Sequence, residues 1–213
     1  MNRRAQIAAA VAVALVLAWL LWPSRYRRVA NLDSRGTTVI AFGDSLTSGY
    51  GAGAGEDYPS RLSALLGTTV ENAGVSGDTT EAALARIDED VLARQPRLVI
   101  VGLGGNDFLR RMPMAGTEAN LRTIVRKIQA SGAMVVLLGF DFPSFGPDYA
   151  EMYEDIAADE GCLLIPDMLD GILNTPSLKS DEVHPNAAGY QVMAERVAGP
   201  LAKLLVKANA TRD

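Results

Sequence analysis

Four short polar segments of this 213-residue chain carry the side chains that acyl transfer requires. That chemistry needs a nucleophile, a base, an acid that orients the base, and donors for an oxyanion. The segments are Gly43-Asp44-Ser45-Leu46-Thr47, residues 72–79, Gly104-Gly105-Asn106-Asp107 and Asp181-Glu182-Val183-His184-Pro185.

Ser45 is the candidate nucleophile, and it needs a base within reach. His184 is the single histidine of the chain, and an imidazole ionises near neutral pH, which suits a group that takes and returns a proton. Asp181 precedes His184 by three residues, and in a turn-like loop this spacing places both side chains on one side. The three residues therefore form a candidate catalytic triad.

The candidate oxyanion donors are the backbone N–H groups of Ser45 and Gly77 and the side-chain amide of Asn106. A glycine at position 77 allows a close approach that a larger residue would block, and Gly74 is the alternative glycine of the same segment. We interpret Asp44 and Asp107 as structural residues that cap or stabilise their loops.

The elements that must position these side chains alternate between strands and helices. Apolar runs predict strands at 37–42, 69–72, 98–103, 134–138 and 162–165, and apolar stripes predict helices at 58–66, 81–94, 117–130, 149–159 and 186–206. This alternation predicts an α/β fold with a five-stranded parallel sheet covered by helices on both faces. In such a sheet the segments that follow the first three strands emerge at one edge, where ligands bind, and the fourth segment can fold back over that edge.

Taken together, the four segments resemble the sequence blocks of the SGNH hydrolases, also called the GDSL family, from about residue 37 to the carboxyl end. The resemblance implies a flavodoxin-like, three-layer α/β/α fold and a serine esterase that works through an acyl-enzyme. It implies these roles: Ser45 as nucleophile, His184 as base, Asp181 as its partner, and Ser45, Gly77 and Asn106 as the oxyanion hole. The residue sequences at 76–79 and 103–107 are most similar to those of the thioesterase, lysophospholipase and arylesterase branch. This resemblance implies that the substrate is a lipid, a small ester or a thioester.

Two alternatives stay open. A carbohydrate acetylesterase would keep the fold and the chemistry and change the substrate, whereas a catalytically inert, membrane-anchored binding module would belong to a different functional class. Phe140 and Phe145 follow the fourth predicted strand, and either they line a pocket for an apolar acyl group or they only pack within their loop.

Composition excludes several other classes of function. A net charge of −5, without a basic cluster in the globular part, argues against a nucleic-acid partner, and one histidine with one cysteine, Cys162, argues against the usual metal sites. The run from Gly49 to Ala54 matches a dinucleotide-binding pattern, but the strand-to-helix turn that this pattern requires is already occupied by residues 43–45. We therefore expect no cofactor, no metal and no obligate protein partner.

Residues 1–28 differ from the rest of the chain. Residues 5–22 contain one polar side chain, Gln6, and as a helix they would span roughly 27 Å, close to the hydrocarbon core of a bilayer. No small-x-small cleavage site follows, so a single-span membrane anchor is favoured over a cleaved signal peptide. The expected organisation is an anchor at 1–28, a linker at 29–36 and a hydrolase domain at 37–213, with the domain periplasmic or otherwise extracytoplasmic. Arginines flank the apolar run on both sides, which leaves the orientation open.

Overall fold

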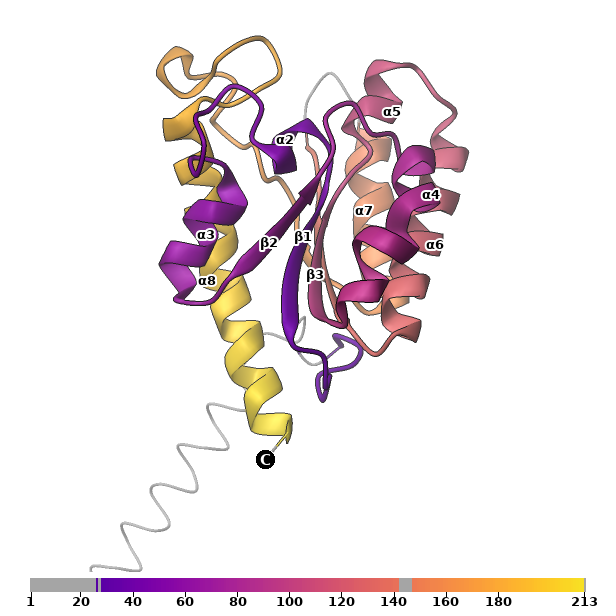
Figure 1. Cartoon of the computed structure of the whole chain (residues 1–213). Coiled ribbons are helices and arrows are strands. Elements are labelled where there is room, and N and C mark those ends of the chain that lie inside the picture. The colour runs from indigo at the N-terminus through magenta and orange to yellow at the C-terminus, as the bar shows by residue number, and fades with distance from the viewer. Residues whose placement is uncertain (1–25, 27, 142–146, 213) are drawn as a thin grey trace, which may run out of the picture.

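The computed structural model describes residues 26, 28–141 and 147–212 of the chain. A central parallel sheet lies between two layers of helices (Figure 1). Its strands are β1 (Thr38–Gly43), β2 (Val70–Gly74), β3 (Pro96–Gly102), β4 (Met134–Leu138) and β5 (Leu163–Ile165). They pair in the order β2-β1-β3-β4-β5, which confirms the predicted five-stranded parallel sheet.

The strands are apolar along most of their length because helices cover both faces of the sheet. In β1 the side chains of Ile40, Ala41 and Phe42 are fully buried, and every residue of β4 is buried. The position of β1 between β2 and β3 is the feature that matters for the site, since the segments that leave these three strands meet at one edge of the sheet.

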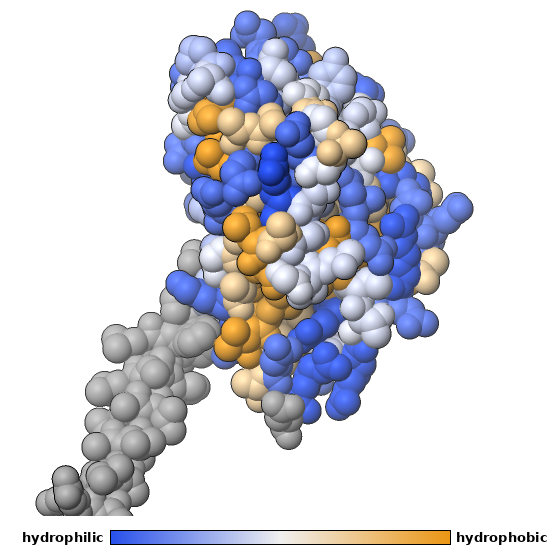
Figure 2. Space-filling view, turned by 60° about the vertical axis from the view of Figure 1, so that its left-hand side comes forward, coloured by the Kyte–Doolittle hydropathy of each residue, from blue (hydrophilic) through white to orange (hydrophobic). Residues whose placement is uncertain are grey.

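The described helices are α2 (Ser45–Ser48), α3 (Tyr58–Leu66), α4 (Thr80–Asp90), α5 (Gly105–Leu109), α6 (Met114–Ala130), α7 (Pro147–Glu160) and α8 (Ala187–Arg212), with 3-10 turns at Leu92–Arg94 and Pro176–Leu178. Helices α3 and α8 pack together on one face of the sheet, and α4, α6 and α7 cover the other face (Figure 1). The surface over α3 and α8 is polar with an apolar area (Figure 2). Leu65 and Val206 are the exposed large apolar side chains of these helices.

Helix α8 is longer than expected and continues through Pro200. Proline removes one helical hydrogen bond, at a cost of roughly 3 kcal/mol in a helix interior. The side chains of Val197, Leu201 and Leu204 are fully buried on both sides of the proline, and their burial offsets that cost.

Three glycines stand side by side where the strands end. Gly43 of β1 pairs with Gly74 of β2 and with Gly102 of β3. A Cβ atom at Gly43 would overlap the Thr47 hydroxyl, and one at Gly74 would overlap the backbone nitrogen of Ser48. This row of glycines lets α2 lie directly on the ends of the strands, which fixes the start of that helix at the edge of the sheet.

The structure extends the domain toward the amino terminus. Residues 29–36, expected to be a linker, contact the domain: Val29 is buried, and the Asn31 side-chain amide donates to the carbonyls of Gln129 and Ala133. Tyr26 is also part of the hydrophobic core. The apolar run that predicts a membrane anchor lies outside the described residues; within residues 26, 28–141 and 147–212, no helix has the length and apolar character needed to cross a membrane.

Candidate active site

Ser45 begins α2 directly after β1, at the edge of the sheet where the sequence places it. Asp44 caps this short helix, because its Oδ1 accepts a hydrogen bond from the Leu46 amide at 3.0 Å. The Ser45 carbonyl accepts hydrogen bonds from the amides of Gly49 and Tyr50, which closes the helix after a single turn. The nucleophile candidate is therefore held by backbone contacts on both sides.

His184 reaches Ser45 from the loop that precedes α8. Its Nε2 lies 3.0 Å from Oγ of Ser45, and its Nδ1 lies 2.8 Å from Oδ2 of Asp181. The loop is closed at its base by hydrogen bonds from the Ser180 amide to the His184 carbonyl and from the Asn186 amide to the Leu178 carbonyl. The structure thus brings together the three residues that the sequence nominates as a triad.

Asp181 is oriented by its own loop. Its Oδ1 accepts hydrogen bonds from the amides of Val183 and His184, both at 2.9 Å, which explains why a spacing of three residues brings the carboxylate to the imidazole. Partial burial alone would raise the pKa of the Asp181 carboxyl. The hydrogen bonds from the Val183 amide and from the His184 ring and amide outweigh that effect and hold the pKa below its usual range, so the group stays ionised.

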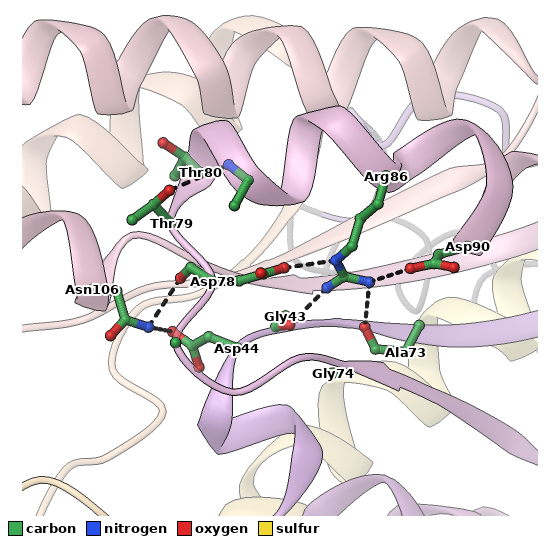
Figure 3. A network of polar contacts seen from close by, with 12 residues as sticks. Gly43, Asp44, Ala73, Gly74, Asp78, Thr79, Thr80, Arg86, Asp90 and Asn106 are labelled. Atoms are coloured by element: carbon green, nitrogen blue, oxygen red, sulfur yellow. Dashed lines mark hydrogen bonds and ion pairs between the residues drawn. The ribbon is translucent and has the colours of Figure 1, made fainter.

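The side-chain amide of Asn106, in α5, points at two acceptors beside the nucleophile turn (Figure 3). Its Nδ2 donates to the Asp78 carbonyl at 2.9 Å and to Oδ2 of Asp44 at 3.3 Å. These contacts tie α5 to the segment that follows β2 and to the residue before Ser45.

Asp44 is a buried carboxyl with no cation among its described partners. Burial raises the pKa of Asp44 to about 7, and the nearby carboxylates of Asp78 and Asp107 add to the rise, while the hydrogen bond from the Leu46 amide opposes it. Asp107 is fully buried as well and accepts hydrogen bonds from the backbone amide and hydroxyl of Thr80, at the start of α4. Asp44 caps α2 and Asp107 ties α5 to the start of α4, so the predicted structural role of both residues is confirmed.

Gly77 lies on the segment between β2 and α4 with φ at +86°, a left-handed conformation that favours glycine. Its carbonyl accepts a hydrogen bond from Nη2 of Arg110 at 2.7 Å. Gly74, the alternative glycine, lies within β2, and its amide donates to the Asn72 side chain at 2.9 Å, so that amide is already engaged.

Arg86 of α4 joins the carboxyl ends of two strands to this segment (Figure 3). Its guanidinium donates to the carbonyls of Gly43 and Ala73 and forms ion pairs with Asp78 at 2.6 Å and Asp90 at 2.7 Å. Sequence reasoning missed Arg86, because nothing in a helical arginine indicates that it reaches across to two strand ends.

A cavity of about 540 Å³ opens beside Ser45 and His184. Its wall is largely apolar and comes from α2, α5, the segment after β4 and the loops before α8. The lining residues are Asp44, Ser45, Leu46, Gly105, Asn106, Phe108, Leu109, Phe140, Leu169, Leu173, Asn174, Lys179, Glu182, Val183 and His184. Phe140 therefore lines the cavity, whereas Phe145 lies outside the described residues. Gly77 does not contribute to this lining.

No group of acidic, histidine or cysteine side chains that could hold a metal ion occurs within the described parts of the chain. The glycine-rich run at 49–54 follows α2 rather than a strand, so it does not form the strand-to-helix turn of a dinucleotide site. Tyr50 of this run has its ring against the imidazole of His184, a contact that has no signature in the sequence.

Comparison with known proteins identifies relatives of this site and fold. The family model described as the GDSL-like Lipase/Acylhydrolase family matches residues 41–192. The chain is 34% identical to Esterase TesA of Pseudomonas aeruginosa and 33% identical to the Thioesterase 1/protease 1/lysophospholipase L1 of Escherichia coli K12; each alignment covers 79% of this chain and, respectively, 89% and 85% of the relative. An acetylxylan esterase of Geobacillus stearothermophilus is 28% identical over 61% of this chain and 70% of its own length.

The fold has solved counterparts. The crystal structure of the psychrotrophic esterase EstA from Pseudoalteromonas, inhibited by monoethylphosphonate, superimposes with a TM-score of 0.72 at 28% identity, over 79% of this chain and 98% of that chain. The matched family region covers the segments of Ser45, Gly77, Asn106 and His184. The chain belongs to the GDSL-like lipase/acylhydrolase family, and it is a serine hydrolase that acts on ester bonds.

Proposed function

We propose that Ser45, His184 and Asp181 form the catalytic triad of an esterase that cleaves carboxylic esters and thioesters through an acyl-enzyme. The observation that carries this proposal is the continuous chain of contacts from Asp181 through the imidazole to Oγ of Ser45, with distances of 2.8 and 3.0 Å. This arrangement is that of a nucleophile with an oriented general base.

In the proposed reaction, Nε2 of His184 accepts the Ser45 proton as Oγ attacks the carbonyl carbon. The imidazolium then returns that proton to the leaving alcohol or thiol, and the acyl group stays on Ser45. Water, deprotonated by the same imidazole, attacks the acyl-enzyme, and the carboxylic acid leaves as Ser45 recovers its proton. Asp181 keeps Nδ1 protonated and stabilises the imidazolium that forms in each half-reaction.

The proposed oxyanion hole consists of the amides of Ser45 and Gly77 and the side chain of Asn106. Both hydrogens of the Asn106 amide have acceptors, so donation to the substrate oxygen would replace one of those contacts. The 3.3 Å contact to Asp44 is the longer one and is the one we expect to be exchanged.

The substrate that the cavity fits best carries an apolar acyl group. Phe108, Leu109, Phe140, Leu169 and Leu173 contribute apolar walls next to the nucleophile, and a cavity of about 540 Å³ accepts a chain longer than acetyl. Relatives named esterase and thioesterase/lysophospholipase support ester and thioester substrates. The acetylxylan esterase relative supports the alternative, an acetylated carbohydrate.

Acyl-chain length distinguishes these substrates. We expect kcat/KM of the hydrolase domain to be higher for p-nitrophenyl hexanoate than for p-nitrophenyl acetate. We expect acetylated xylo-oligosaccharides to be poor substrates. Phe140→Ala should alter this preference, because Phe140 is both buried and part of the cavity wall. A preference for the acetylated sugars would favour the carbohydrate acetylesterase instead.

Ser45→Ala tests the nucleophile, and we expect it to abolish p-nitrophenyl ester hydrolysis and labelling by a fluorophosphonate probe. A wild-type protein that neither turns over esters nor reacts with the probe would point to the inert binding module.

We also propose that residues 1–28 tether the domain to a membrane, with the domain on the extracytoplasmic side. The tether rests on the length and apolar character of the run at 5–22. Arginines flank this run on both sides and select neither orientation, so the experiment alone decides the side of the membrane. Membrane fractionation of the full chain, followed by carbonate washing and protease treatment of spheroplasts, tests both parts. Release of the protein by carbonate would contradict the tether, and protection from protease would contradict the orientation.

A further inference from the structure

Tyr50 lies against the imidazole of His184, outside the cavity that receives the substrate. The two ring centroids are 4.5 Å apart and the ring planes are inclined by 46°. His184 is among the described residues that line the cavity, whereas Tyr50 is not. The imidazole therefore has the cavity on one side and the phenol ring on another.

The backbone of Tyr50 is tied to the nucleophile and to α8. Its amide donates to the Ser45 carbonyl at 3.0 Å, and its carbonyl accepts a hydrogen bond from the Tyr190 hydroxyl at 2.8 Å. Tyr190 is fully buried, so this second contact comes from a fixed part of the core. These contacts fix the backbone from which the Tyr50 ring projects toward His184.

The chain around Tyr50 also packs directly on the loop that carries His184. Gly51 has φ at +89°, and a Cβ atom there would overlap the Ser180 hydroxyl and lie 2.8 Å from the Pro185 carbonyl oxygen. Ser180 and Pro185 bracket the loop of Asp181 and His184. The segment that follows the nucleophile helix is thus in contact with the loop that carries the base.

We propose that Tyr50 is a positioning residue that keeps the imidazole of His184 aligned between Ser45 and Asp181. Asp181 holds only one side of the imidazole, through Nδ1, and its own side chain is 43% exposed. The contacts at Nδ1 and Nε2 still allow the ring to tilt about the line that joins these two atoms, and small misplacements of a catalytic group lower the rate strongly. The Tyr50 ring limits this tilt and keeps water from the face that it covers. The inference rests on the proposed function, since it assigns His184 the role of base.

Kinetics of Tyr50 variants test the catalytic consequence. Tyr50→Phe keeps the ring, and we expect its kcat on p-nitrophenyl butyrate to stay within about twofold of wild type. Tyr50→Ala removes the ring, and we expect kcat to fall roughly tenfold to a hundredfold with KM within about twofold, because Tyr50 does not line the cavity. Tyr50→Leu retains most of the volume and gives the same test if Tyr50→Ala lowers the melting temperature.

A spectroscopic readout tests the positioning without turnover. His184 is the only histidine of the chain, so protein labelled with ¹⁵N-histidine gives the signals of one imidazole. We expect the Nδ1-bound proton, protected by Asp181, to be observed in wild type and in Tyr50→Phe, and to exchange with water at least several-fold faster in Tyr50→Ala.

Two results would overturn the proposal. One is a Tyr50→Ala protein with unchanged kcat and unchanged Nδ1 proton exchange. The other is a rise in KM at constant kcat, which would make Tyr50 a substrate contact. Absence of esterase activity in wild type would instead refute the proposed function, and the proton exchange would still decide whether Tyr50 holds the ring.

Discussion

Nδ2 of Asn106 lies 3.3 Å from Oδ2 of Asp44, the residue that precedes the nucleophile. This contact links α5 to the turn that begins α2, and so it couples a proposed oxyanion donor to the cap of the nucleophile helix. Because Asp44 is buried, protonation of its carboxyl decides whether the Asn106 amide donates to a charged or a neutral acceptor.

Asp44 is expected to make the stability of the domain depend on pH. The pKa of this carboxyl is raised from 3.8 to about 7 by burial, so the folded state keeps a proton that the unfolded chain releases. The contribution of Asp44 to the free energy of unfolding is therefore full below about pH 4 and is lost as the pH rises to about 7.

Asp44→Asn removes this titration and retains a good capping side chain. Relative to the variant, wild type should lose roughly 2–3 kcal/mol of unfolding free energy between pH 5 and pH 8. Urea unfolding of both proteins at the two pH values measures this change. Parallel stability curves for the two proteins would contradict the raised pKa.

Asn106→Ala tests the proposed oxyanion hole. Loss of one donor should lower kcat on p-nitrophenyl butyrate by roughly 10²–10³-fold, because the developing negative charge loses a hydrogen bond that the ground state needs less. KM should change much less than kcat. Since Asn106 also donates to the Asp78 carbonyl, thermal unfolding serves as the control for a folded variant. A loss of kcat below twofold would remove Asn106 from the hole.

The sequence was sufficient to predict where the chemistry-bearing side chains gather. Ser45 follows shortly after an apolar run that predicts a buried strand, and parallel strands deliver their carboxyl ends to one edge of the sheet. The Asp181 carboxylate accepts hydrogen bonds from the amides of Val183 and His184, and these bonds form a turn that brings the imidazole to the carboxylate. Because this turn is local, the three-residue spacing in the sequence is enough to predict it.

Contacts made by long side chains across the fold could not be predicted in this way. Arg86 meets the carbonyl of Gly43, forty-three residues away, and Tyr190 meets the carbonyl of Tyr50 across a separation of 140 residues. Such contacts depend on how α4 and α8 pack on the sheet. Helix α5 was also missed, because Gly104-Gly105-Asn106 has the composition of a turn, and buried contacts hold it in a helical conformation.

Leu109 tests the apolar acyl pocket. Its side chain lines the cavity and is 53% exposed, so we expect it to contact the distal part of a long acyl chain rather than an acetyl group. Leu109→Ser should raise KM for p-nitrophenyl octanoate about fivefold or more and leave KM for the acetate unchanged.

Leu65→Ser is the matched control for Leu109→Ser, because Leu65 is similarly exposed on α3 and does not line the cavity. It should leave both KM values unchanged. Equal changes in KM for octanoate and acetate in Leu109→Ser would argue that the pocket does not distinguish acyl chains at this position.

Arg86 should be required both for stability and for the geometry of the site. Its side chain is 18% exposed and that of Asp78 is 9% exposed, so Arg86→Ala leaves a largely buried carboxylate without its cation. We expect a loss of roughly 3–5 kcal/mol in the free energy of unfolding. Arg61→Ala, which breaks the more exposed pair with Glu56 (side chains 35% and 43% exposed), is the control and should cost about 1 kcal/mol or less.

The loss should be smaller when both partners are removed. Asp78→Ala in the Arg86→Ala background eliminates the unpaired charge, so the double variant should be more stable than the sum of the single losses predicts. Arg86 also donates to the Gly43 carbonyl, and this contact holds the end of β1 next to Ser45. The double variant should therefore regain stability without regaining wild-type kcat. Recovery of full kcat in the double variant would show that Arg86 acts only by neutralising Asp78.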